Sequence, residues 1–504
     1  MKEFYLILSK KSIVSGLLAV GTVLCMCAPV FAYTPSDPYY RWQKDVYNQI
    51  HAPEAWDYTV GSSTVVVAVI DTGVDILNSD LADNIWVNTD EVPNNGLDDD
   101  NNGYVDDVHG WNIVENNNDV SIANITEADD AGAVNHGTLL AGLIGASGDN
   151  EVLGAGLNWH VSIMPLRAVN NSGGGDLVDI ARAVNYAVDN GASIINLSFV
   201  GFTTEPALTA ALYRAYQKGV LVVAAAGNSR NDSSGNENLT KVKQYPICLD
   251  YDYAQNWVLG VASVSASDTL SYFGDYGSCI DISAPGEKIY STQKVSEQPG
   301  FEKDFDGGWY GTSFAAPLVA GTAALIKSIR PEWAAKEIIE TLLKSADDID
   351  YLNPGFAGQL GYGRLNAGKA VRLAAESKVK PVEGVYRGAL VNVKKQYYVD
   401  VFEGAKKAHR FPLENFSEKS SRWLVADNMF VYVYQRNGSL VAQAWDFAGK
   451  KIMTNLTLPG FVAIIQLDKG YVWGENENII ITAKKNNNLK KIIIDVPSQS
   501  WKTE

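Results

Sequence analysis

Three short segments of this chain carry residue types that suit nucleophilic catalysis, each within two residues of a glycine. Asp71 lies in V-A-V-I-D-T-G-V-D, His136 in N-H-G-T-L-L-A-G and Ser313 in G-T-S-F-A-A-P-L-V-A-G. A serine hydroxyl is a weak nucleophile, and an imidazole oriented by a carboxylate is a base that activates it. Any one of these residues alone is usually structural. Together, in the order Asp, His, Ser, they predict a catalytic triad.

Strand-like and helix-like segments alternate between Thr64 and Ala375, and they must position these residues. Thr64–Ile70 is a continuous apolar and β-branched run, which is typical of a buried parallel strand. Similar runs occur at Val161–Val169, Ser193–Phe199, Val220–Ala225 and Val258–Val264. Amphipathic helical patterns separate them. We therefore expect an α/β fold with a parallel sheet flanked by helices on both faces.

The predicted elements place two of the candidate catalytic residues at element ends, one after a strand and one at the start of a helix. Asp71 follows its strand directly, at the carboxyl edge, where parallel sheets bind ligands. Ser313 begins an apolar run that extends to Ile329 and predicts a buried helix. A serine at this position lies beside the positive end of the helix dipole.

The distribution of charge divides the chain into two parts. The formal net charge is −17, which argues against a nucleic-acid partner. Residues 33–376 contain 45 acidic and 19 basic residues, whereas residues 377–504 contain 12 acidic and 19 basic ones. We therefore expect an α/β domain at 33–376 and a second domain at 384–504.

The second domain shows the alternation of β-strands. Tyr397–Phe402 and Met429–Tyr434 are examples, and Asn437-Gly438 between two strand-like runs predicts a tight hairpin. A second hairpin is expected around Asn486–Asn488. These patterns predict a smaller antiparallel β-sandwich.

Residues 1–32 have the pattern of a secretory signal peptide. A lysine-containing start precedes an apolar stretch, and the small residues before Ala32 suit cleavage there. We expect a secreted, extracellular protein without a transmembrane anchor after cleavage; a retained N-terminal anchor is the alternative. Cys248 and Cys279 are the only cysteines after residue 32, and an exported chain allows them to pair.

The three motifs, and the chain from about 37 to 373, resemble the subtilisin-like serine proteases of the subtilase family. The resemblance implies that Ser313 attacks a peptide carbonyl, that His136 transfers its proton and that Asp71 orients the imidazole. It also assigns Asn228, in A-G-N-S, as the donor that stabilises the oxyanion. A structural turn is the alternative for Asn228.

The same resemblance implies a substrate cleft in which a peptide binds as an added strand. One side resembles the family's flanking strand at Ser172, Gly173 and Gly174, and the other resembles it at Ser198, Phe199 and Val200. Val200 stands where the family has glycine, and Gln244 falls at the base of the primary pocket. We expect a preference different from a broad hydrophobic one. Alternatively, Val200 points into the core.

An acidic loop at Asp98–Asp107 is the strongest metal candidate. The side chains of Asp98, Asp100, Asn102 and Asp106, with the Tyr104 carbonyl, match the first nine positions of an EF-hand loop. The twelfth position is not Glu, so the EF-hand is incomplete. Hard oxygen ligands favour Ca²⁺; a solvated turn rich in Asp and Asn is the alternative. The resemblance implies a second calcium site that joins Asp80 to the loop Asp149–Val152.

The sequence thus predicts a secreted, calcium-stabilised serine endopeptidase. It would act as a monomer on protein or peptide substrates, through an acyl-enzyme intermediate. The alternative from another class is a surface-binding or adhesion protein in which the positively charged β domain carries the main role. Deleting residues 384–504 separates the two interpretations, because unchanged cleavage of small peptides with lost surface retention indicates a targeting domain.

Overall fold

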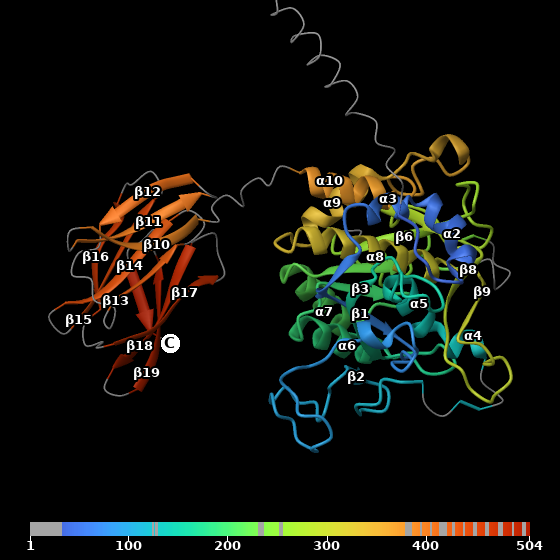
Figure 1. The fold of residues 1–504 in the computed structure, drawn as a ribbon, viewed down its shortest axis with the longest axis horizontal. Coiled ribbons are helices and arrows are strands. Elements are labelled where there is room, and N and C mark those ends of the chain that lie inside the picture. Colours follow the sequence, from blue (N-terminus) through green and yellow to red (C-terminus); the bar gives the residue numbers. More distant parts are fainter. Residues whose placement is uncertain are drawn as a thin grey trace, which may run out of the picture. The chain divides into compact units, whose positions relative to one another are not determined.

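The structure is a computed structural model, and it describes residues 33–377 apart from 123–124, 127–129, 230–235 and 251–255. Beyond residue 377 it describes the backbone of strands between 386 and 503. The chain divides into two compact units, Met1–Glu376 and Ser377–Glu504 (Figure 1). The predicted signal peptide at 1–32 lies outside the described residues.

A seven-stranded parallel sheet forms the centre of the first unit. Its strands are β1 (Gly61–Asp71), β2 (Trp111–Asn112), β3 (His160–Arg167), β4 (Ile194–Leu197), β5 (Leu221–Ala225), β6 (Val258–Val264) and β7 (Ile282–Pro285). Their order is β2-β3-β1-β4-β5-β6-β7. β1 is an interior strand, with Ile70 paired to Leu166 on one side and Leu197 on the other. The predicted parallel α/β architecture is confirmed.

Helices pack on both faces of this sheet (Figure 1). The helices described in this unit are α2 (Tyr40–Gln49), α3 (Ala52–Trp56), α4 (Ala131–Val134), α5 (His136–Gly145), α6 (Leu177–Asp189), α7 (Pro206–Gln217), α8 (Thr312–Ile329), α9 (Ala335–Ser345) and α10 (Ala367–Glu376), of which α4 packs in a small separate cluster. Short 3-10 turns lie at Ala82–Asn84 and Asp350–Leu352, and a hairpin pairs β8 (Ile289–Thr292) with β9 (Phe305–Trp309).

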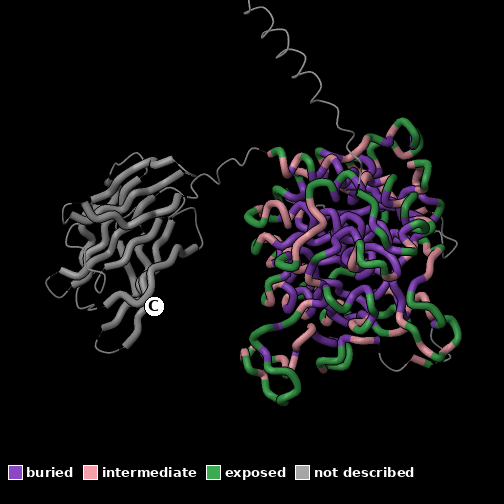
Figure 2. The backbone as a smooth tube through the Cα atoms, in the orientation of Figure 1, coloured by how far each residue is buried: buried purple, intermediate pink, exposed green. Residues whose placement is uncertain are grey.

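Alternate side chains of β1 contribute to two separate cores. Val67 packs in one core with α5 and α8, and Ile70 packs in the other with α6 and α7. This follows because successive side chains of a strand point to opposite faces. Figure 2 shows that buried residues fill the interior of this unit, whereas exposed residues lie along its loops.

α8 runs through the first core and carries Ser313 near its start. Among the described residues it is the helix with the length and apolar composition of a membrane span, but 78% of it is buried inside the protein. Pro317 lies in its early turns, where a missing N–H is best tolerated. The sequence prediction of a buried core helix is therefore confirmed.

The second unit contains three antiparallel sheets, with orders β10-β11-β12, β13-β14-β15-β16 and β17-β18-β19-β20. The strands are β10 (Tyr386–Val393), β11 (Gln396–Glu403), β12 (Lys406–Pro412), β13 (Ser421–Val425), β14 (Met429–Arg436), β15 (Ser439–Asp446), β16 (Lys451–Leu458), β17 (Ala463–Tyr471), β18 (Glu477–Lys485), β19 (Asn488–Asp495) and β20 (Ser500–Thr503). Arg436 is opposite Ser439, as a hairpin at Asn437-Gly438 requires, although those two residues lie outside the described ones. The sandwich arrangement stays a prediction.

Candidate active site

Asp71 and His136 form a hydrogen-bonded pair at the carboxyl edge of the sheet. Asp71 is the last residue of β1, and His136 is the first residue of α5. His136 Nδ1 lies 2.8 Å from Asp71 Oδ1, and the Asp71 side chain is only 2% exposed. Asp71 Oδ1 also accepts the Thr72 N–H. A carboxylate acceptor keeps the proton on Nδ1, so Nε2 is the basic nitrogen of the ring.

The environment of His136 makes its imidazole a stronger base. Burial lowers the pKa of His136 because it disfavours the charged form of the ring. The negative charge of Asp71 and its hydrogen bond act in the opposite direction and together outweigh burial, so the pKa is raised above its ordinary value of 6.5. The side chain remains 23% exposed, which leaves it accessible to a substrate.

Ser313 lies in the first turn of α8, close to this pair. The His136 ring is 5.9 Å, between centroids, from the ring of Phe314, the next residue after Ser313. The Ser313 hydroxyl donates to the Ser198 carbonyl at 3.0 Å, and the Ser198 hydroxyl donates to the Ser313 carbonyl at 2.9 Å. Ser313 is thus bonded to Ser198 rather than to His136 in this structure.

Asn228 follows β5 by three residues, and its side-chain amide is held in one orientation. Asn228 Oδ1 accepts the Thr312 N–H at 2.9 Å and the Thr312 hydroxyl at 3.1 Å. Its Nδ2 group lies beside Gly311, two residues before Ser313. Because Oδ1 is bonded at the start of α8, the N–H donors of Asn228 are available to an anion formed at Ser313.

Comparisons with known proteins agree with this arrangement. A profile of the subtilase family matches residues 62–363. The chain belongs to the subtilase family. Thermitase from Thermoactinomyces vulgaris is 33% identical over 340 residues, which cover 68% of this chain and 100% of that protein. The halolysin-like extracellular serine protease Nep of Natrialba magadii is 31% identical over 337 residues, covering 67% of this chain and 52% of that protein.

A solved protease structure from Pseudoalteromonas arctica matches with a TM-score of 0.53 at 28% identity, covering 68% of this chain and 100% of that one. The subtilase fold, with its seven-stranded parallel sheet, is therefore the fold of the first unit. This subtilase is a serine endopeptidase, since the family profile and the thermitase-like relatives agree.

The segment predicted as one side of the substrate cleft differs from an extended strand. Ser172, Gly173 and Gly174 form an exposed turn closed by Asn170, whose Oδ1 accepts the N–H groups of Ser172 and Gly174 at 2.9 and 3.0 Å. The Asn170 N–H also donates to the Gly174 carbonyl. A local side chain that captures both N–H groups competes with strand pairing, which explains the difference.

Of the other predicted substrate residues, Ser198 contacts the start of α8 directly. Ser198 bonds to Ser313, and Phe199 is half-buried against the core that contains α6 and α7. Val200 is also half-buried but does not join either described core, so the alternative that it points into the core is not supported. Gln244 is 1% exposed, and its Nε2 donates to Asp275 at 3.0 Å.

The predicted ligands of the acidic loop are engaged in different ways. Asp98 accepts two backbone N–H groups of its own loop, and Asp106 accepts those of the turn at 95–96. The amide of Asn102 donates to Asp100 Oδ2 at 3.0 Å. Of the predicted carboxylates in this loop, Asp100 is the one that joins a cluster with other acidic side chains.

That cluster consists of Glu91, Asp100 and Asp107, whose carboxylate oxygens lie within 4.8 Å of one another. Glu91 and Asp107 are buried, and Glu91 Oε2 has no hydrogen-bond partner. Asp107 accepts the Tyr186 hydroxyl at 2.5 Å, and the Tyr186 ring packs edge-on against Tyr104. Three close carboxylates repel one another, so this site fits a hard cation with oxygen ligands. Glu91 is not predicted from the sequence, and Asp107, which ends the predicted loop, is not among the predicted ligands.

Asp80 lies fully buried beside the loop that the resemblance associates with it. Its carboxylate accepts the Asn150 side-chain amide at 2.9 Å and the Gly154 N–H at 3.1 Å. Burial raises the pKa of Asp80 to about 7, although these two hydrogen bonds act to lower it. Asp37 accepts the N–H groups at 149 and 150 nearby. Both Asp80 oxygens accept N–H groups, whereas Glu91 of the other cluster keeps one buried carboxylate oxygen without a hydrogen-bond partner.

Proposed function

We propose that this subtilase hydrolyses peptide bonds through Ser313, His136, Asp71 and Asn228, by way of an acyl-enzyme. The observation that carries the proposal is the 2.8 Å bond between His136 and Asp71 at the edge of the sheet, beside the start of α8. Ser313 Oγ attacks the carbonyl carbon while His136 Nε2 takes its proton, and that proton then goes to the leaving amine. Water repeats the sequence on the acyl-enzyme with the same base.

Asn228 and Asp71 support this reaction without exchanging protons. The Asn228 Nδ2 group donates to the oxyanion of each tetrahedral intermediate, while its Oδ1 stays bonded to Thr312. Asp71 stabilises the imidazolium that forms on His136. Ser313 has to exchange its bond with Ser198 for one with His136, and catalytic hydrogen bonds of free enzymes commonly form only when substrate binds.

We also propose that calcium binds at the Glu91 cluster and stabilises the loop around it. Glu91, Asp100 and Asp107 would supply carboxylate oxygens, and the cation would offset their mutual repulsion. The unpartnered Glu91 Oε2 supports this assignment, because a buried carboxylate oxygen is stable only when it is paired. The role of the ion is structural.

Export and the second unit complete the proposal. Residues 1–32 would direct secretion, and the relative Nep is named as an extracellular protease. Residues 384–504 would form an antiparallel β-sandwich whose net positive charge suits retention on an anionic surface or polymer. Adhesion as the main role is the alternative for this unit. The enzyme would act on peptides as a monomer.

Replacing the nucleophile tests the mechanism. We expect Ser313→Ala to lower kcat on a peptide substrate by about 10⁶-fold, the loss that subtilisin shows without its nucleophile. Ser62→Ala is a matched control, because Ser62 lies near the opposite end of β1 from Asp71. Circular dichroism verifies that both variants fold. Cleavage by Ser313→Ala at the rate of the unmodified enzyme would reject the mechanism.

A further inference from the structure

Two buried oxygens that the catalytic mechanism does not use lie beside the candidate oxyanion donor. Gly227 precedes Asn228, and its N–H donates to Thr312 Oγ1 at 3.0 Å. A β-carbon built on Gly227 would collide with Gln244 Oε1 and with Asp275 Oδ2. Both oxygens therefore lie directly against the Gly227 α-carbon, one residue away from Asn228.

Gln244 also adjoins the segment that contacts the nucleophile. Tyr245, the next residue, exchanges two backbone hydrogen bonds with Gly201, at 2.7 and 2.9 Å. The same segment, 198–201, is bonded to Ser313 at its other end. Gln244 thus directly precedes a residue paired to the segment that bonds to the nucleophile, and the resemblance to subtilases implies that Gln244 lies at the base of the primary pocket.

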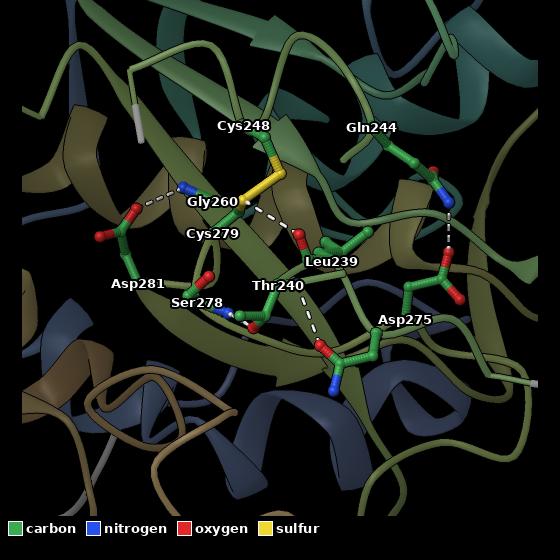
Figure 3. The surroundings of a disulfide bond; sticks show 10 residues. Leu239, Thr240, Gln244, Cys248, Gly260, Asp275, Ser278, Cys279 and Asp281 are labelled. Carbon is green, nitrogen blue, oxygen red and sulfur yellow. Dashed lines mark hydrogen bonds between the residues drawn. A yellow bond between two sulfur atoms is a disulfide. The ribbon is translucent and has the colours of Figure 1, made fainter. Parts of the chain in front are cut away.

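Asp275 fixes the direction of the Gln244 amide. Gln244 Nε2 donates to Asp275 Oδ2 at 3.0 Å and to Ser229 Oγ at 3.1 Å, so these two acceptors fix which end of the amide carries the N–H groups; Figure 3 shows the bond to Asp275. The Asp275 carboxylate also accepts the Ser229 hydroxyl at 2.7 Å and the Glu237 N–H at 2.8 Å. The Ser229 N–H is a fourth donor to this carboxylate, and Asp275 is 0% exposed. The four donors together fix the orientation of the Asp275 side chain.

The Gln244 Oε1 atom has no hydrogen-bond partner in the structure, even though Gln244 is buried and only 1% exposed. A buried acceptor without a donor is unfavourable, and a native structure that contains one needs a reason for it. A substrate that brings a donor would satisfy this atom, whereas an apolar side chain would cover it and leave it unpaired. Sites built around such groups reject analogues that lack the matching donor.

We propose that Gln244 Oε1, positioned by Asp275, selects peptides whose residue before the scissile bond carries a side-chain N–H donor, as Lys, Arg, Gln and Asn do. The inference rests on the proposed function, since it concerns the same cleft. The donor bonds to Oε1, and the negative charge of Asp275 favours a cationic donor further. Asp275 acts through Gln244 and is a positioning residue.

A disulfide between Cys248 and Cys279 joins the two chain segments that carry these residues. Cys248 donates its N–H to the Gln244 carbonyl at 3.0 Å, and Cys279 lies four residues after Asp275. Figure 3 shows this disulfide together with the hydrogen-bonded pair formed by Gln244 and Asp275. The bridge therefore restricts movement of the donor-recognising pair.

Matched peptide pairs test the selection. Fluorogenic peptides that differ only at this position compare Gln with Met and Lys with norleucine, which have similar length but differ in N–H donors. We expect kcat/KM of the full-length enzyme to favour the N–H member of each pair by about tenfold or more. A ratio at or below one in both pairs, or a stronger preference for Ala or Ser than for all four, overturns the inference.

Two variants separate the hydrogen bond from the charge. Gln244→Met should bring the Gln/Met ratio to about one or lower, while Asp275→Asn should reduce the Lys/norleucine ratio more than the Gln/Met ratio. Because each ratio is internal to one variant, partial unfolding does not affect it. Gln217→Met, at an exposed position of α7, is the control and should keep both ratios. Unchanged ratios in Gln244→Met contradict the role of Oε1.

The same assay distinguishes failure of this inference from failure of the proposed function. If Ser313→Ala cleaves all four peptides as fast as the unmodified enzyme, the proposed mechanism fails. If cleavage depends on Ser313 but ignores the N–H donor, the mechanism stands and only the selection is wrong.

Discussion

Two threonines beside the catalytic residues connect the parts of the site. Thr72 follows Asp71, and its hydroxyl accepts the N–H of Gly137, next to His136, at 3.1 Å. Thr312 precedes Ser313, and its hydroxyl donates to Asn228. Each threonine is the chain neighbour of one catalytic residue, and its hydroxyl is hydrogen-bonded to the segment that carries another. Preorganised positioning of this kind is a large part of what an active site contributes to catalysis.

At the residue scale, the pH dependence of catalysis tests the contribution of Asp71. In Asp71→Asn the charge that raises the pKa of His136 is lost, while the burial that lowers it remains. We expect the acidic limb of the kcat/KM profile to move to lower pH, from an apparent pKa above 6.5 to one below it. We also expect kcat to fall by about 10⁴-fold, because the amide favours the wrong tautomer.

A pH profile of the residual activity, compared with that of the unmodified enzyme, measures this shift. Asp83→Asn, at an exposed carboxylate in the 3-10 turn at 82–84, controls for a change of net charge. An acidic limb that stays in place after Asp71→Asn would mean that another group titrates in this range.

At the element scale, the position of α5 decides where His136 lies. Gly142 lets this helix approach β8 closely, because a β-carbon there would collide with the side-chain oxygens of Ser291 and Thr292. The hydroxyls of these residues donate to the carbonyls of Leu139 and Thr138 at 2.7 and 3.0 Å. The hairpin of β8 and β9 thus supports the helix that begins with the catalytic base.

Gly142→Ala should disturb this contact. Alanine favours a helix by about 1 kcal/mol over glycine, but crowding costs about 1–3 kcal/mol and broken hydrogen bonds add to it. We therefore expect a net loss of about 1–3 kcal/mol in the free energy of unfolding and a lower kcat/KM. Urea unfolding in a Ser313→Ala background avoids self-digestion.

Gly355→Ala serves as the control, since a β-carbon at Gly355 meets nothing within 4 Å. If Gly142→Ala is as stable as this control, the close approach of α5 and β8 does not limit stability.

The sequence predicts these elements well where burial dictates the pattern. The parallel strands are buried on both faces, so their apolar runs mark them clearly, and Val258–Val264 is predicted with the bounds that the structure has. Asp71 and Ser313 can be predicted from the sequence because each lies in a motif next to a clear element: Asp71 ends an apolar strand, and Ser313 begins an apolar helix.

Tertiary contacts explain what the sequence does not reveal. The fold of the loop brings Glu91 close to Asp100, and Asp275 contacts Gln244 although 31 positions separate them in the sequence. No short sequence motif predicts either pair. The turn at 172–174 depends on Asn170, whose side chain offers the backbone an alternative to strand pairing.

At the scale of the whole molecule, the first unit is strongly acidic, so binding of a cation should increase the free energy of unfolding of the entire unit. Residues 33–376 carry 45 acidic against 19 basic residues, and Glu91, Asp100 and Asp107 bring three carboxylates of this excess together, two of them buried. A ligand that binds only the folded state stabilises it in proportion to the logarithm of its concentration. Calcium should therefore shift unfolding of the entire unit.

We expect saturating calcium to raise the Tm of the Ser313→Ala enzyme, with about 2.7 kcal/mol of stabilisation at one hundred times Kd. Glu91→Gln should remove most of this gain, because it removes one carboxylate from the cluster. Glu340→Gln, at an exposed carboxylate on α9, should keep it. Calorimetry with calcium and with a chelator measures the difference; an equal gain in both variants would place the ion elsewhere.

The bond between Cys248 and Cys279 has a practical corollary for anyone who produces this enzyme. A reducing cytosol, rich in glutathione, keeps thiols apart, so recombinant material made there would carry free sulfhydryls at this site. Periplasmic or refolded preparations, in which air or an oxidoreductase joins them, are the ones whose cleavage preferences should be trusted.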